Sequence, residues 1–371
     1  MTGSGVYVHV PFCARRCSYC SFVTAVGRQG EEAYFDALEL EAEARLGELP
    51  LPIDTAYFGG GTPSYVDPAR LGRLILLVRG AGARLVEVTA EGNPDDLDVT
   101  TLDGLSAAGV NRLSLGIQSL EDAELALLER RHDSAGALVA LRRAAPRFER
   151  ISADLMIGIP GQTRESLRRS VEGILESGAG HVSAYLLEIE KAPGLLALRE
   201  ESPGLFADDE EVAERWEEVN EALESAGLAR YELSNWARPG QESRHNLKYW
   251  EGEPVLGLGL AAHSFDGETR RANTASMEEY LRRVGERGRA EATRSRLPAE
   301  EAIRERALLG LRVASGISEE EYDRACSTAG ADERERLGRC EEAALLERRE
   351  GRIRLTRRGV LLSNEVFSLL V

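Results

Sequence analysis

The chain has 371 residues, of which 43% are hydrophobic and 29% are charged, a composition typical of globular proteins. Its 46 basic and 63 acidic residues give a net charge of −17, which disfavours a general nucleic-acid-binding protein because such proteins present a basic surface to phosphates. No run approaches the ~18–20 apolar residues of a membrane span, and no signal-peptide pattern opens the chain. We therefore expect a cytoplasmic protein without an integral membrane segment.

Three of the five cysteines lie close together near the start of the chain. Residues 6–10 are predicted to form a strand ending at Pro11, and Cys13, Cys17 and Cys20 follow in a C-x3-C-x2-C spacing. Thiolates suit an iron–sulfur cluster or zinc, but a structural zinc site normally has four protein ligands. Three cysteines favour a [4Fe–4S] cluster with one iron open to a small ligand. Two alternatives stay open, a redox dithiol of Cys17 with Cys20 and a zinc site completed by His9.

Predicted strands and helices then alternate. We predict helices at 31–46, 69–79, 102–108 and 121–143, a helix after the turn at 160–163, and strands at 54–58, 85–90, 112–117, 151–157 and 181–187. This alternation predicts a parallel sheet with right-handed crossovers. Six βα units before residue 227 are too few for a closed barrel of ~250 residues. The predicted fold class is therefore α/β, an open (β/α)6 partial barrel.

Glycine and polar residues follow the predicted strands. The cysteine loop, the glycines at 59–61, Glu91, Gln118 and Asp154 all lie at or near the C-terminal ends of strands. Functional residues of parallel sheets gather at this edge. Glycines in such a turn let the backbone approach a ligand and present N–H donors to it. The sequence therefore predicts one site along this edge.

The repeat fades after residue 228. We expect one more strand at 228–236 and irregular functional structure at 239–272. A helix at 300–314, a capping box at 318–321, a hairpin at 345–355 and a helix opened by Thr356 follow. We therefore divide the chain into a barrel core at 1–235, a connecting region at 236–297 and a small, mostly helical, winged-helix-like domain at 298–371. The acidic charge favours a lid or packing role for that domain over DNA binding.

The cysteine triplet, with Tyr19 before its third cysteine, resembles the signature of the radical S-adenosylmethionine (SAM) superfamily. The segments 8–13, 58–64, 91–94, 112–119, 154–160 and 245–250 together resemble the oxygen-independent coproporphyrinogen III oxidase-like family over nearly the whole chain. The resemblance implies that Cys13, Cys17 and Cys20 hold a [4Fe–4S] cluster whose open iron chelates SAM. It also implies that one electron from the cluster can cleave SAM to a 5′-deoxyadenosyl radical.

The same resemblance implies a set of SAM-binding residues. Tyr7 and Tyr19 would flank the cluster-bound SAM, and Gly60 and Glu91 would hold it. The residues that match a second SAM site of the oxidase are Gly61, Thr62, Gln118, Arg130 and Asp154. The residue types fit this assignment, because carboxylates suit ribose hydroxyls and the ammonium group, Gln suits the adenine edge, and Arg suits the SAM carboxylate.

Two departures from the oxidase pattern resemble the HemW branch of the family, whose members are haem chaperones. Phe22 stands where the oxidase has a fourth cysteine, and the chain begins six residues before Tyr7. The H-N-x-x-Y-W motif of that branch is present at 245–250. The resemblance implies a haem site made by four residues of the motif, His245, Asn246, Tyr249 and Trp250. A neutral imidazole suits haem iron, and aromatic rings suit the macrocycle. His263 is a second candidate ligand.

We therefore expect a cytoplasmic haem chaperone that carries a [4Fe–4S] cluster and SAM and delivers haem to haem-requiring acceptor proteins, such as respiratory enzymes. A homodimer and SAM cleavage are left open. One alternative is an enzyme, oxygen-independent coproporphyrinogen III oxidase, which Phe22 disfavours. The other alternative is radical SAM modification of RNA, which the net charge of −17 disfavours.

Overall fold

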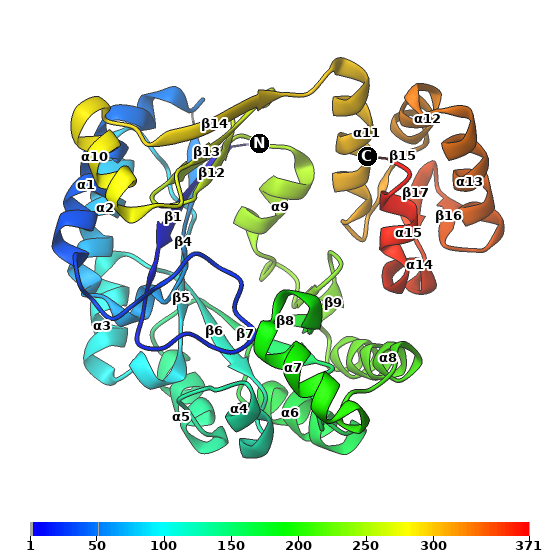
Figure 1. The fold of residues 1–371 in the computed structure, drawn as a ribbon, viewed down its shortest axis with the longest axis horizontal. Helices are drawn as coiled ribbons and strands as arrows, with labels where there is room; N and C mark the ends of the chain where they lie inside the picture. Colours follow the sequence, from blue (N-terminus) through cyan, green and yellow to red (C-terminus); the bar gives the residue numbers. More distant parts are fainter. Residues whose placement is uncertain (1–2, 51, 371) are drawn as a thin grey trace.

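A computed structural model describes residues 3–50 and 52–370 of the chain (Figure 1). Its centre is a mixed 12-stranded sheet in the order β14-β13-β12-β11-β1-β4-β5-β6-β7-β8-β10-β9. The parallel part consists of β11 (Val255–Leu258), β1 (Ser4–Val10), β4 (Ile53–Gly60), β5 (Glu87–Gly92), β6 (Arg112–Gln118), β7 (Arg150–Ile157) and β8 (His181–Leu186). The six predicted parallel strands are confirmed, and β11 adds a parallel neighbour to β1.

Helices cover the outer side of the curved parallel sheet, which Figure 1 shows as an arc. They are α1 (Glu31–Arg45), α2 (Pro68–Gly80), α3 (Val99–Ala108), α4 (Asp122–Leu127), α5 (Ser134–Ala144), α6 (Arg164–Glu176) and α8 (Asp209–Ser225). The short helix α7 (Pro193–Glu201) follows β8 and contacts the turns at 189–191 and 203–205. Strands such as β6 are buried along their whole length because helices cover one side and the barrel interior covers the other. Among the described residues, no helix is both long and apolar enough to cross a bilayer.

The single helix predicted at 121–143 is wrong, because the structure has α4 and α5 with a break between them. Glu129 adopts a left-handed backbone conformation (φ 57°), and the Asp133 side chain accepts a hydrogen bond from the Gly136 N–H and so begins α5. The break turns Arg130 towards the strands, where Gly116 O accepts a hydrogen bond from its guanidinium. Contacts with distant segments thus outweigh a locally continuous helical pattern.

The strand predicted at 228–236 and the irregular structure predicted at 239–272 are also wrong. The structure has two short antiparallel strands, β9 (Ala229–Arg230) and β10 (Asn235–Ala237), at the edge of the sheet. The second region contains α9 (Arg244–Glu251), β11, β12 (His263–Phe265) and β13 (Thr269–Asn273), and α10 (Met277–Arg287) and β14 (Glu291–Arg296) follow it. The elements are short and α9 is mostly polar, so the apolar periodicity used for prediction is weak. Because β11 pairs with β1, this region continues the sheet of the core.

The last part of the chain follows the predicted pattern of helices around a hairpin. It consists of α11 (Ala299–Leu311), β15 (Ile317–Ser318), α12 (Glu319–Thr328), α13 (Ala331–Glu342), β16 (Leu346–Arg349), β17 (Arg352–Leu355), α14 (Arg357–Leu361) and α15 (Ser363–Phe367). The capping box of Ser318 and Glu321 is present, and the Thr356 side chain caps α14. In Figure 1 this group of elements lies beside the barrel, at the end of α11.

A buried carboxylate joins the barrel to the strands that extend its sheet. Glu41 on α1 is fully buried and accepts hydrogen bonds from Arg45 (2.9 Å), Asn273 (2.8 Å), the Tyr280 hydroxyl (2.8 Å) and the Gly259 N–H (2.8 Å). These partners come from α1, β13, α10 and the turn after β11. Removing one member of a buried ionic network leaves the others desolvated and unpaired, which is costly.

We therefore predict that Glu41→Ala lowers the free energy of unfolding by about 3–5 kcal/mol, because Arg45 loses its buried partner. Chemical denaturation followed by circular dichroism measures the change. Glu43→Ala is the matched control, since Glu43 is exposed on the same helix and its loss should change stability by less than about 0.5 kcal/mol. Equal effects of the two substitutions would contradict a structural role for the Glu41 network.

Candidate functional site

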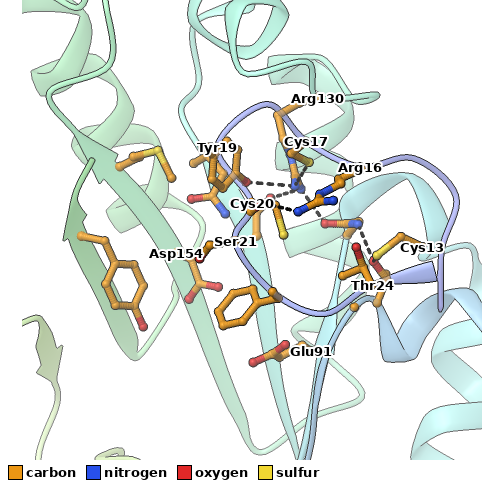
Figure 2. Close-up of a pocket in the computed structure, with 18 of the residues that line it drawn as sticks. Cys13, Arg16, Cys17, Tyr19, Cys20, Ser21, Thr24, Glu91, Arg130 and Asp154 are labelled. Carbon is orange, nitrogen blue, oxygen red and sulfur yellow. Dashed lines mark hydrogen bonds between the residues drawn. The ribbon is translucent and has the colours of Figure 1, made fainter. Parts of the chain in front are cut away.

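A pocket of about 360 Å³ lies at the C-terminal edge of the parallel strands (Figure 2). The predicted site residues that line it are Cys13, Cys17, Tyr19, Cys20, Gly60, Gly61, Thr62, Glu91, Gln118, Arg130 and Asp154. Figure 2 shows the three cysteines on the loop along one side of the pocket and Glu91 and Asp154 on the other. Tyr7 does not line the pocket, because its ring stacks on Tyr57 with a centroid distance of 6.1 Å. The fold thus brings most of these dispersed residues together.

The cysteine loop begins and ends in a two-stranded sheet of β2 (Phe12–Cys13) and β3 (Ala25–Val26). The Thr62 hydroxyl donates a hydrogen bond to Cys13 Sγ (3.4 Å). Burial raises the pKa of the Cys13 thiol to about 11, so a metal bound there would have to displace a proton. Within the described part of the chain, no three His, Cys, Asp or Glu side chains converge as the ligands of a single metal ion would. Thiolates on different irons of a cluster are spaced more widely.

His9 is not placed to complete a zinc site. Its Nδ1 atom contacts the Tyr7 hydroxyl (3.1 Å) and its Nε2 atom contacts the carbonyl oxygen of Val23 (2.8 Å). Burial lowers the pKa of this imidazole, which keeps it neutral. With both ring nitrogens in hydrogen bonds, His9 supports the cysteine loop from the side of β1.

Arg130 joins the cysteine loop to the barrel. Its guanidinium donates hydrogen bonds to Cys17 Sγ (3.4 Å) and the Tyr19 hydroxyl (3.2 Å) on the loop side. On the barrel side it donates to Asn93 Oδ1 (2.5 Å) and the carbonyl oxygen of Gly116 (2.6 Å). The break between α4 and α5 is what places the side chain here. Arg130 therefore fixes the position of the loop that carries Cys17.

The glycine turn after β4 forms the floor of the pocket beneath the loop. Gly60 has a φ of 110°, and a Cβ atom there would lie 2.3 Å from the His9 ring. A Cβ atom on Gly61 would lie 2.6 Å from the carbonyl group of Pro11. The Gly60 N–H donates to the Glu91 carboxylate (3.1 Å). Only glycine lets the backbone pass this close to the loop.

Two carboxylates face the pocket from β5 and β7. The Tyr57 hydroxyl donates to Glu91 (2.7 Å), and the Ser114 hydroxyl donates to Asp154 (3.2 Å). Desolvation, together with the nearby charge of Glu91, raises the pKa of Asp154 to about 7. Desolvation also raises the pKa of Glu91. A cationic ligand would stabilise both carboxylates in their ionised form, so the pair favours a positively charged group.

Several buried polar atoms at the pocket wall have no hydrogen-bond partner within the described protein. They are Thr24 Oγ1, Gln118 Oε1 and Arg130 Nε, and all three residues line the pocket. Gln118 also has a positive φ of 68°, a strained conformation for this residue type that is frequent at functional sites. Buried polar groups are normally paired, so these atoms are available to a ligand or to water. The glycine turn, the acid pair and these atoms fit a SAM-sized polar ligand beside a thiolate-bound cluster.

The predicted haem motif lies elsewhere. Figure 1 shows α9, which carries it, inside the curve of the sheet, and the His245 side chain is fully buried there. Its Nδ1 atom contacts the Thr55 hydroxyl (2.9 Å), its Nε2 atom contacts the Tyr249 hydroxyl (3.1 Å), and its ring stacks on Tyr57 at 5.2 Å. Burial lowers the pKa of His245 to about 3. In this arrangement His245 has no free nitrogen for iron, contrary to the expectation from the motif.

The other motif residues differ in accessibility. Asn246 lines a small internal cavity of about 40 Å³ near Asp154. Trp250 packs under the guanidinium of Arg312, which lies 4.4 Å from the ring centroid. Tyr249 is 38% exposed, which makes it the motif residue most open to a large planar ligand.

Sequence reasoning missed several residues of the pocket. Asn93, Ser114, Met156 and Tyr185 all line it. Ser114 and Met156 lie within predicted strands, and Asn93 directly follows β5. Asn93, Met156 and Tyr185 lie at or near the C-terminal end of a parallel strand, which is the signal that could have found them, whereas Ser114 lies in the first half of β6.

The chain matches two protein families in separate segments. Residues 7–174 match the radical SAM superfamily, and residues 297–362 match the HemN C-terminal domain. The chain is 35% identical to the heme chaperone HemW of Bacillus subtilis, over 97% of both chains. It is 36% identical to heme chaperone HemW of Mycobacterium tuberculosis H37Rv, over 99% of this chain and 94% of that protein.

Two further similarities concern a mitochondrial protein and a solved structure. The chain is 36% identical to radical S-adenosyl methionine domain-containing protein 1, mitochondrial, of Bos taurus, over 86% of this chain and 75% of that protein. The structure of coproporphyrinogen III oxidase (HemN) from Escherichia coli superposes with a TM-score of 0.84 and 24% identity, covering 100% of this chain and 90% of the oxidase. This superposition confirms the radical SAM partial-barrel fold.

Proposed function

The chain belongs to the radical SAM superfamily and, within it, to the HemW family, and we propose that it is a haem chaperone that also holds a [4Fe–4S] cluster and SAM. The observation that carries this proposal is the similarity to proteins named heme chaperones along 97–99% of the chain. Phe22, at the position of the oxidase's fourth cysteine, is 64% exposed at the pocket and supports the chaperone over the oxidase.

The proposed cluster ligands are Cys13, Cys17 and Cys20. A [4Fe–4S] cluster with three cysteine ligands supplies an open coordination position and a reducing electron. Support comes from the placement of all three thiols on one loop over the pocket, with Arg130 close to Cys17. The positive guanidinium would balance part of the negative charge of a thiolate-bound cluster.

The proposed SAM-binding residues surround the same pocket. Glu91 and Asp154 offer negative charge to the ammonium and sulfonium groups, and the Gly60–Gly61 backbone closes the space beneath the loop. The polar residues that remain are Thr62, Gln118 and Arg130, and Tyr19 stands on the loop side with its hydroxyl held by Arg130. Tyr7 would contribute indirectly, because its ring stacks on Tyr57, whose hydroxyl donates a hydrogen bond to Glu91. Residues assigned to a first and a second SAM site thus line one cavity.

Haem is the proposed cargo, and haem-requiring proteins are its proposed acceptors. We place haem binding around α9, which carries the H-N-x-x-Y-W motif of His245, Asn246, Tyr249 and Trp250. Tyr249 offers its partly exposed ring to the macrocycle, while His245 and Trp250 hold α9 against the barrel and against Arg312. In this proposal the cofactor pocket and the haem-binding region around α9 lie in different parts of the fold.

We predict that anaerobic reconstitution with iron and sulfide yields about four irons and four sulfides per chain. Cys17→Ser should abolish this loading, because a hydroxyl does not replace a thiolate ligand. Cys340→Ser is the control, since Cys340 lies on α13 in the C-terminal helices and should leave the loading unchanged. A stoichiometry of one zinc and no iron would contradict the cluster.

We predict that SAM binds more tightly at pH 8 than at pH 6. The Asp154 carboxyl has a pKa of about 7, so it is mostly ionised above pH 7. Below pH 7 it is mostly protonated and must lose its proton before it can pair with a cation. Affinity should therefore fall as the pH drops below 7, by up to about tenfold per pH unit. Isothermal titration calorimetry at both pH values measures this difference.

Asp154→Asn should weaken SAM binding and remove this part of the pH dependence. Asp36→Asn, on the exposed side of α1, is the control and should keep both the wild-type affinity and its pH profile. A pH-independent wild-type affinity would show that Asp154 makes no charged contact with SAM.

We predict that haem titrated into the purified protein gives a Soret band that saturates at about one haem per chain. The loaded protein should then transfer haem to an apo-acceptor at a rate different from that of free haem. Cys326→Ser is the control for adventitious thiol binding and should bind haem like the wild type, because Cys326 lies on α12, far from α9 in sequence. Unsaturable binding by the wild-type protein would rule out the chaperone function.

A further inference from the structure

An imidazole open to solvent lies beside the motif helix. His263 on β12 is exposed, and it lines a pocket of about 200 Å³. The pocket is formed by Tyr249, Gly252, Glu253, Val255, His263, Ser264, Phe265, Arg270 and Leu309, which come from α9 and its C-terminal turn, β11, β12, β13 and α11. We call this the β12–α9 pocket. It is separate from the cofactor pocket, with which it shares none of these residues.

The strand register places the polar groups of the β12–α9 pocket on one face of the sheet. His263 pairs with Ala272 and Phe265 pairs with Arg270 across antiparallel strands. Directly opposite residues project to the same side, and residues two apart on one strand do so as well. His263, Phe265 and Arg270 therefore share a face. This face continues on β14, where Thr293 and Ser295 are exposed.

The chemistry of the pocket suits a planar apolar anion that contains a metal. Val255, Phe265, Leu309 and the ring of Tyr249 supply apolar surface. The Arg270 guanidinium lies over the Phe265 ring, 4.9 Å from its centroid, at the pocket wall. Of the two nearby carboxylates, Glu253 is paired with Lys248 and Glu305 with Arg270, so a propionate at Arg270 would share or replace the Glu305 contact. An exposed imidazole beside apolar walls and a guanidinium matches haem with its iron and propionates.

His245 has a different part in the same region. Its Nε2 atom contacts the Tyr249 hydroxyl, and its Nδ1 atom contacts Thr55 on β4. These contacts orient the Tyr249 side chain, which is one of the residues that line the β12–α9 pocket. His245 is therefore a positioning residue, which explains why a motif histidine can be fully buried.

We propose that haem binds in the β12–α9 pocket with His263 as its axial ligand, Arg270 facing a propionate and the Tyr249 ring against the macrocycle. This inference rests on the proposed haem chaperone function. A pocket of about 200 Å³ encloses only part of a haem, so most of the macrocycle stays accessible to an acceptor protein. His245 acts on haem only through Tyr249.

The test is a haem titration followed by the Soret band in four proteins, the wild type, His263→Ala, His245→Gln and Arg296→Ala. His263→Ala should bind haem at least tenfold more weakly, shift the Soret maximum and regain the wild-type maximum when free imidazole is added. His245→Gln should keep the wild-type maximum while its affinity falls only a few-fold, because glutamine can still hold the Tyr249 hydroxyl. Arg296→Ala, an exposed position on β14, is the control and should match the wild type.

Arg270→Ala should weaken haem binding without moving the Soret maximum, since it removes a propionate partner and leaves the iron ligand in place. A wild-type maximum and affinity in His263→Ala would overturn the inference, as would loss of the iron ligand in His245→Gln. Circular dichroism spectra confirm that each variant is folded. If the wild-type protein itself fails to bind haem, the proposed function fails rather than the choice of ligand.

Discussion

The contact on which the cofactor pocket depends is the guanidinium of Arg130. It is hydrogen-bonded on one side to Cys17 and Tyr19 of the cysteine loop and on the other to Asn93 and Gly116 at the strand ends. None of these four acceptors is a carboxylate, so these hydrogen bonds do not themselves neutralise the guanidinium. A cluster bound through thiolates would supply negative charge next to Arg130. The electrostatics of the pocket is therefore complete only with an anionic group at the loop.

The interior of the barrel connects this pocket to α9. The Tyr57 hydroxyl donates to Glu91 at the pocket, and the Tyr57 ring stacks on His245, which contacts Tyr249 at the far side. These groups form an unbroken series of contacts from the cofactor pocket to the β12–α9 pocket. The barrel core between the two pockets is thus polar, where barrels of this kind usually have branched apolar side chains.

The parallel sheet and its functional edge could be predicted because each signal is local. Apolar strands that carry Gly60, Glu91, Gln118 or Asp154 in their C-terminal halves reveal both the strand and its functional edge. The break before α5 could not be predicted, because the acceptors that hold Arg130 are Asn93, directly after β5, and Gly116 on β6 rather than residues of its own segment. The burial of His245 was hidden for the same reason. Its partner Thr55 lies 190 residues away in the sequence, and only the folded barrel brings α9 against β4.

The two pockets differ in size and in the polarity of their lining, as their proposed ligands do. The cofactor pocket is bounded by the cysteine loop, by glycines that leave no room for a side chain and by buried carboxylates, a lining that suits a polar ligand. The β12–α9 pocket is smaller, about 200 Å³ against about 360 Å³, and mostly apolar, with a single imidazole open to solvent. Differences in affinity between related complexes arise mainly from dissociation rates, and a carrier must release what it binds. A partly exposed site on the strands that extend the sheet meets this requirement, whereas a ligand bound by His245 would have to leave through the packed interior of the barrel.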